Sequence, residues 1–498
     1  MNIIKALLIF LVLWFPCIKV SPSPYYDNNL NIRLAHQELY ALHPASAEKL
    51  LRAEELKNGL NGYIVFYRLY SEIISLTLSN SPEEFSKKVP VLDKYIQAIR
   101  VLPEDTPEYR MLLGEALVFT GLLNVKYDNK FSGLVDCMKG YNLLEENAQK
   151  YPSFEPDDKI LGIIRIGVAF MPGVLKWGAR LFNIESNPQE GLKNLATFSE
   201  YSRGKPGYEE EAFLFTLAGY RLMNQEDAAI TLIREKMSAF KESSILNLIA
   251  ASVCTQANDA ETAISLLSEI SPEKLEIAFP QLLFMKGKAK LMRLDKDSDI
   301  PLLSYLKESS GDDYIKTILY DLACFSYISG DTARYLAYLG QVSEKGREFL
   351  SRDIEASFEA KKNGFPNRSL MRAELLVRGG YVHEAESELS AITDLKVISV
   401  DDKVLFHFLK GECFRLTNRV RQAESEYLNS VNAGESTGSY ISQKALVYSG
   451  LMMEKNNFPK EAEEYYNSCL RFDPVGNPYS SFFRNRAKAG LIRLSLSE

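Results

Sequence analysis

Apolar residues recur along most of this chain at the three-to-four-residue spacing of helices that bury one face. Between residues 444 and 474 two such stripes follow one another, and their members are Leu446, Gly450 and Met453, then Ala462, Tyr466 and Cys469. Pro459 suits the first turn of the second helix, and Pro474 cannot continue it. The pattern predicts two antiparallel helices that form a hairpin.

The small residues of this hairpin indicate where its helices cross. Gly450 and Ala462 allow the two backbones to approach, and Tyr466 fills the seam beside them. A lone hairpin cannot bury both of its faces, so it requires neighbouring hairpins on each side. The segment therefore predicts a stack of similar units.

The same pattern returns through the C-terminal three fifths of the chain. A small residue at the predicted crossing point recurs at Gly219, Ala251, Gly287, Ala323, Ala373, Gly411 and Gly450. These positions scatter around the spacing of about 34 residues that is typical of such repeats. In the last three repeats a second small residue and then a large one follow at constant spacing, as Ala385 with Leu389, Ala423 with Tyr427, and Ala462 with Tyr466.

These observations predict an all-α protein, a right-handed α-solenoid of helix-turn-helix repeats over residues 206–498. The long gap between two of the repeats predicts an insertion, an extra helix or a long loop, near residues 344–366. Residues 478–497 are amphipathic and charged, which is typical of a capping helix.

Residues 28–205 predict a less regular helical region with degenerate repeats. Its predicted helices are separated by proline and asparagine and cover residues 28–42, 46–56, 63–78, 82–101, 108–124 and 130–151. An apolar stretch over residues 160–182 follows, broken at Pro172 and too short and too charged for a membrane span. It fits either a buried helical hairpin or an apolar patch that faces lipid or a partner.

The first residues have the order of a secretory signal. Lys5 precedes an unbroken apolar run over residues 6–15, and Pro16 ends that run. Such a run is shorter than the roughly 20 residues of a membrane span. We predict a signal peptide over residues 1–20 and an exported protein. Two alternatives stay open, lipidation at Cys17 and an uncleaved N-terminal anchor.

Composition narrows the classes of partner and site. The 498 residues carry a formal net charge of −7 with mixed signs and no long basic face, which argues against nucleic acid as a partner. The five cysteines beyond the signal, Cys137, Cys254, Cys324, Cys413 and Cys469, are far apart, and each lies in a helical pattern. They are predicted to be buried small apolar residues, without disulfides or a metal.

No catalytic constellation emerges from the sequence. The string GESTG over residues 434–438 matches GxSxG, but it lies between two predicted helices, and a nucleophile elbow requires a preceding strand. The acidic run over residues 209–211 is interpreted as a solvated helix face. We predict that the protein is not an enzyme and that it uses no cofactor and no metal.

The concave face of the predicted solenoid is the remaining candidate site. The first helices of the repeats line it, and the inward positions are Asn367, Leu370, Glu374, Val377, Leu405, Phe408, Glu412, Arg415, Lys444, Val447, Leu451 and Glu454. The face mixes apolar and acidic groups and lacks a lysine-plus-asparagine set for a terminal carboxylate. A helical or extended protein segment is the predicted ligand.

The repeats that carry Cys413 and Gly450 resemble tetratricopeptide repeats. Segments 172–192, 314–331 and 366–381 resemble exported tetratricopeptide proteins of Gram-negative bacteria and are more distantly similar to a eukaryotic tetratricopeptide family associated with clearance of inclusion bodies. The resemblance implies an α-solenoid with a scaffold role and no catalytic residues.

The sequence thus predicts a non-enzymatic protein–protein interaction scaffold of the bacterial cell envelope, located in the periplasm or associated with the outer membrane. One alternative is a glycan-binding outer-membrane lipoprotein, which would need lipidation at Cys17 and exposed aromatic platforms, whereas Trp177 is the sole tryptophan after the signal. The other alternative is an enzyme with an unrecognised site.

Overall fold

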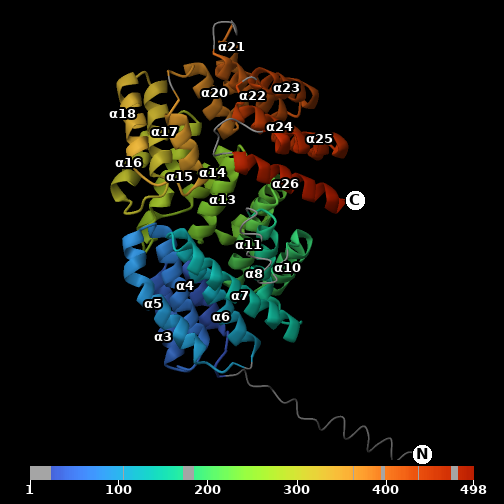
Figure 1. The fold of residues 1–498 in the computed structure, drawn as a ribbon. Helices are drawn as coiled ribbons and strands as arrows, with labels where there is room; N and C mark the ends of the chain where they lie inside the picture. Colours follow the sequence, from blue (N-terminus) through green and yellow to red (C-terminus); the bar gives the residue numbers. More distant parts are fainter. Residues whose placement is uncertain are drawn as a thin grey trace, which may run out of the picture.

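The computed structural model describes residues 24–104, 106–171, 184, 186–362, 364–393, 399–435, 437–472 and 480–497. Over these residues it contains 24 α-helices, three short 3-10 helices and no strand. Successive helices pack as antiparallel hairpins that stack on one another (Figure 1). The predicted all-α solenoid is confirmed.

The N-terminal part consists of three hairpins, and proline and asparagine lie at the breaks between their helices. Ser81 and Thr106 accept hydrogen bonds from backbone N–H groups of the helices that follow them, and proline occupies the first turn of each. The predicted helices of this part are confirmed. They are α2 (Leu30–Tyr40), α3 (Pro44–Glu55), α4 (Gly62–Ser79), α5 (Pro82–Arg100), α6 (Pro107–Lys126) and α7 (Lys130–Lys150).

A fourth unit connects this part to the later repeats and consists of α8 (Asp158–Val168), α10 (Pro188–Ser202) and α11 (Tyr208–Leu222). Helices α8 and α10 approach closely at Gly162 and Gly191, where a Cβ on either glycine would lie within 3.0 Å of the other helix. The apolar face of α8 is buried. The predicted break at Pro172 and Trp177 lie outside the described residues, so the second half of that stretch stays a prediction.

The remaining helices continue the hairpin pattern to the C-terminus. They are α12 (Glu226–Lys236), α13 (Ser244–Gln256), α14 (Ala260–Ser268), α15 (Pro280–Met292), α16 (Asp299–Glu308), α17 (Ile315–Ile328), α18 (Thr332–Glu344), α19 (Ser351–Ala360), α20 (Arg368–Gly379), α21 (Val382–Ser390), α22 (Val400–Leu416), α23 (Val420–Gly434), α24 (Tyr440–Lys455), α25 (Pro459–Arg471) and α26 (Ser480–Ser497). Helix α19 lies in the stretch 344–366 and packs on α17 and α18.

The small residues at the helix crossings explain the tight pairing of the last hairpins. A Cβ on Gly411 would lie 2.6 Å from the ring of Tyr427, and a Cβ on Gly450 would lie 2.5 Å from the ring of Tyr466. Both tyrosines are fully buried. Gly219 differs, because its nearest neighbour is Leu195 of the preceding helix α10, at 2.5 Å from the position of a Cβ.

The solenoid bends back on itself, and its last helix contacts the start of the repeat region. Arg493 of α26 donates to the backbone carbonyl of Met223, and Arg486 pairs with Glu226 of α12. Figure 1 shows α26 lying between the last hairpins and the helices around α11. Helix α26 therefore covers part of the concave side of the repeats.

Two further observations concern predictions made from the sequence. Cys254, Cys324, Cys413 and Cys469 are buried free thiols, as predicted, and Cys137 is partly buried. No helix in the described part of the chain is both long and apolar enough to cross a membrane. Residues 1–20 and Cys17 are outside the described residues.

Candidate functional site

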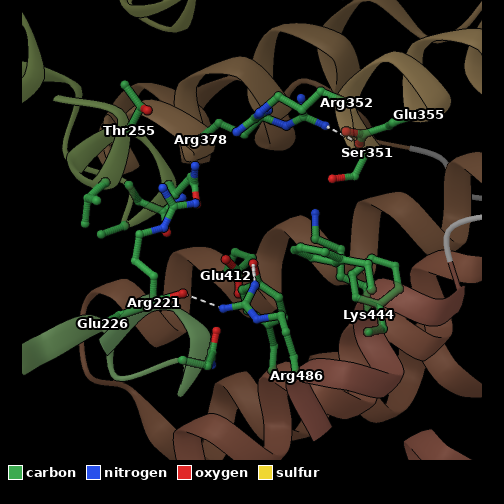
Figure 2. Close-up of a pocket in the computed structure, with 18 of the residues that line it drawn as sticks. Arg221, Glu226, Thr255, Ser351, Arg352, Glu355, Arg378, Glu412, Lys444 and Arg486 are labelled. Carbon is green, nitrogen blue, oxygen red and sulfur yellow. Dashed lines mark hydrogen bonds and ion pairs between the residues drawn. The ribbon is translucent and has the colours of Figure 1, made fainter. Parts of the chain in front are cut away.

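The inner helices of the ring enclose a cavity of about 390 Å³. Its walls come from α11, α12, α13, α15, α19, α20, α22, α24 and α26, so residues more than 250 positions apart face one space (Figure 2). A smaller cavity of about 80 Å³ adjoins it and shares Arg352, Glu374 and Lys444 with it. The main cavity lies in the size range of about 300–1,000 Å³ that is typical of ligand sites.

The structure brings half of the predicted groove residues to this space. The main cavity is lined by Glu374, Val377, Phe408, Glu412 and Lys444, and Leu405 lines the adjoining cavity. These side chains come from the first helices of three consecutive repeats, α20, α22 and α24, which is the geometry that the repeat pattern predicts.

The other predicted groove residues lie elsewhere. Leu370 and Val447 are 1% and 0% exposed, so their prediction as groove residues is wrong, because the first helices bury two faces against neighbouring repeats. Asn367 caps α20 by accepting a hydrogen bond from Leu370 N at 3.2 Å. Leu451 is partly buried against the C-terminal core.

Helix α26 removes another predicted position from the open face. Glu454 accepts from Arg493 of α26 at 2.6 Å and from the hydroxyl of Tyr466 at 2.5 Å. Arg415 pairs with Glu412 at 2.8 Å and lies over the ring of Tyr448, 5.4 Å from its centroid. Glu454 and Arg415 are therefore engaged inside the protein and do not line the cavity.

Each carboxylate of the main cavity has a cationic partner. Arg378 lies 2.6 Å from Glu374 and 3.3 Å from Glu355. Glu412 is paired with Arg415 outside the cavity wall, and Glu226 with Arg486. Burial disfavours the charge of Glu355, but Arg378 and Arg352 hold its pKa below the usual value. Two of these carboxylates, Glu355 and Glu374, therefore share a single cation.

Three cations of the cavity have no such partner. Among the described residues no carboxylate lies within ion-pair distance of Arg221, Arg352 or Lys444. Arg221 donates to the neutral side chain of Gln256 at 2.7 Å, and Lys444 lies over the ring of Phe408 at 4.5 Å. Desolvation inside the cavity and then the nearby charge of Arg352 lower the pKa of Arg221. The cavity therefore carries uncompensated positive charge.

The residues that line the cavity do not form a recognisable reaction centre. Neither histidine nor cysteine is among its described lining residues. In the described parts of the chain, no group of three or more metal-ligating side chains converges. Of the GxSxG string, Ser436 lies outside the described residues, and Gly434 ends α23.

A second charged cluster was missed from the sequence and lies in the core of the N-terminal part. Lys159 of α8 lies 2.7 Å from Glu115 of α6 and 3.0 Å from Glu211 of α11, and all three are buried. His36 stands 3.9 Å from Glu211 and is 3.0 Å from the hydroxyl of Tyr67. The interpretation of residues 209–211 as a solvated face is therefore wrong, because Glu210 and Glu211 point into the protein.

The fold and cavity define an all-α solenoid of helical hairpins whose inner helices line a cavity. No protein-family description matches the sequence. No curated protein matches it either. Among solved structures, a chain from the crystal structure of the APC/C hetero-tetramer Cut9-Hcn1 is similar with a TM-score of 0.29 and 11% identity, over 93% of this chain and 90% of that chain.

Proposed function

We propose that this protein is a non-enzymatic protein–protein interaction scaffold of the bacterial cell envelope that binds a segment of its partner in the central cavity. The observation that carries the proposal is the cavity itself, which is lined from three consecutive repeats by side chains such as Glu374, Phe408 and Lys444. Export to the envelope is supported by the apolar run over residues 6–15.

A protein segment suits this site for a physical reason. The walls combine aromatic rings with paired and unpaired charges, and a peptide presents apolar side chains, charged side chains and backbone hydrogen-bonding groups within a few residues. A cavity of about 390 Å³ admits a short part of a chain rather than a folded domain. The partner is therefore expected to contribute a loop or a terminus.

Site-specific photo-crosslinking tests the proposal. A photoreactive phenylalanine analogue replaces Ser351, an exposed residue on the cavity wall, in cells that express the full chain. The matched control carries the analogue at Ser268, which is also exposed but lies on α14 away from the cavity. We expect one protein to be captured reproducibly at Ser351 and not at Ser268. Equal capture at both positions, or none at Ser351, would contradict the proposal.

The envelope location has its own measurement. We expect deletion of residues 1–20 to retain the protein in the cytoplasmic fraction, whereas the full chain fractionates with the periplasm or the outer membrane. Metabolic fatty-acid labelling of the full chain and of Cys17→Ala distinguishes a lipidated protein from a soluble exported one. Full chain that stays cytoplasmic would refute this part of the proposal.

A further inference from the structure

The charge of the cavity is unusual because its three unpaired cations face one space. Arg221, Arg352 and Lys444 come from α11, α19 and α24, and Figure 2 shows them around the same cavity. The cavity lining holds five cations and four carboxylates, and two of these carboxylates, Glu355 and Glu374, share the cation Arg378. Like charges gathered in a partly desolvated space repel one another, and a bound anion would remove that repulsion.

The same cavity contains polar groups that lack hydrogen-bond partners. The amide Nδ2 of Asn224, the amide Oε1 of Gln225 and the Nε of Arg486 are buried, and none has a partner among the described residues. Leaving a buried donor or acceptor unpaired costs roughly 1–3 kcal/mol, so this part of the wall is incompletely satisfied. One of the two amide groups offers a donor and the other an acceptor.

We infer that the cavity binds an acidic peptide segment, with its carboxylates against Arg221, Arg352 and Lys444. This inference rests on the proposed function and names the chemistry of the segment that enters the cavity. Guanidinium and ammonium groups form charge-assisted hydrogen bonds with carboxylates, which are stronger than neutral ones.

The composition of the site favours a peptide over a phosphate polymer. The chain has a formal net charge of −7, and four glutamates stand on the cavity wall, so a polymer with a phosphate at every unit would meet repulsion as well as attraction. Aromatic side chains at Phe408 and Tyr448 provide apolar surface for the aliphatic parts of a peptide. The site is therefore suited to carboxylates carried by a peptide rather than to a polyphosphate.

Fluorescence anisotropy with rhodamine-labelled hexaglutamate and hexaglutamine tests the inference on the full chain. The two peptides have nearly the same shape and differ in charge. We expect hexaglutamate to bind at least tenfold more tightly and its affinity to fall as sodium chloride is raised. Arg352→Gln and Lys444→Gln are each expected to weaken hexaglutamate binding about three- to tenfold. Lys236→Gln, at an exposed lysine of α12 outside the cavity, is the matched control and should leave affinity unchanged.

Inorganic tripolyphosphate is the competitor that separates the two anion chemistries. The inference is contradicted if tripolyphosphate binds and hexaglutamate does not, if the two peptides bind equally, or if Lys236→Gln weakens binding as much as Lys444→Gln. Thermal melting of each variant checks folding, and Arg221→Gln, at a residue that keeps exposed surface, provides a third variant.

The two proposals fail in different ways. Crosslinking of one partner at Ser351 together with equal affinity for both peptides would leave the scaffold function standing and refute the acidic chemistry. Selective binding of hexaglutamate, without any partner captured in cells, would support the acidic chemistry and refute the scaffold function.

Discussion

Replacement of Lys159 by methionine should destabilise the protein by about 3–5 kcal/mol at pH 8, because it leaves two buried carboxylates without their cation. Lys159 is 2% exposed, and its Nζ lies 2.7 Å from Glu115 and 3.0 Å from Glu211. Methionine has a similar length and no charge, so Lys159→Met keeps most of the packing against the rings of Phe198 and Tyr208.

The magnitude follows from these distances. Two unit charges about 3 Å apart attract by roughly 6 kcal/mol at an effective dielectric constant of about 20, and desolvation of each ion offsets several kcal/mol of this attraction. The substitution measures the free-energy cost of leaving the carboxylates of Glu115 and Glu211 buried without a cation. Burial already raises the pKa of Glu115 to about 8. In the variant both carboxyls should take up protons more readily still, so the loss should be smaller at pH 5 than at pH 8.

Urea unfolding followed by circular dichroism and by tyrosine fluorescence gives the free energies, provided the two signals coincide. The control is Glu115→Gln combined with Glu211→Gln, which removes both negative charges and keeps the side-chain shapes. In that background Lys159→Met should be neutral or stabilising, because it removes a buried ammonium group that no longer has a carboxylate partner. An equal loss in both backgrounds would refute the electrostatic reasoning and assign the effect to packing.

Three further predictions concern packing, pH and ring closure. Gly450→Ala places a Cβ 2.5 Å from the ring of buried Tyr466 and should lower the free energy of unfolding by about 1–3 kcal/mol, whereas Gly340→Ala, with open space around it, should not. Burial raises the pKa of Asp157 to about 7, above the unfolded value, so its contribution to stability is lost as pH rises from about 4 to 7. Asp157→Asn should therefore reduce the difference in Tm between pH 5 and pH 8. Arg493→Gln should speed amide exchange in α26.

The local parts of the fold were predictable because their signals are contiguous in the sequence. Caps such as Ser81, prolines in first turns, and the paired small and aromatic positions at Gly411 and Tyr427 each act within one hairpin. These features determine helix bounds and the stacking of neighbours. The same locality explains why six of the positions predicted for the concave face lie around the two cavities.

The remaining features depend on contacts between distant segments. Glu115, Lys159 and Glu211 lie on three helices, and in the sequence Glu211 belongs to an acidic run that resembles any solvated helix. The apolar periodicity of the sequence does not indicate that Lys159 lies opposite Glu211. The prediction for Glu454 as an open-face residue had the same weakness, because only the path of the whole superhelix brings Arg493 to it.

Closure by α26 determines what kind of site the concave face becomes. On the outer side, the ion pair between Lys455 of α24 and Asp227 of α12 is highly exposed and is worth about 0–1 kcal/mol. The inner contacts of Arg493 are largely buried, and breaking one of them would leave a charge or a carbonyl unpaired. The buried contacts of Arg493 therefore stabilise the packing of α26 more than the exposed ion pair does. If α26 moved away, the wall would lose Arg486, and an enclosed cationic cavity would become an open groove of ordinary repeats.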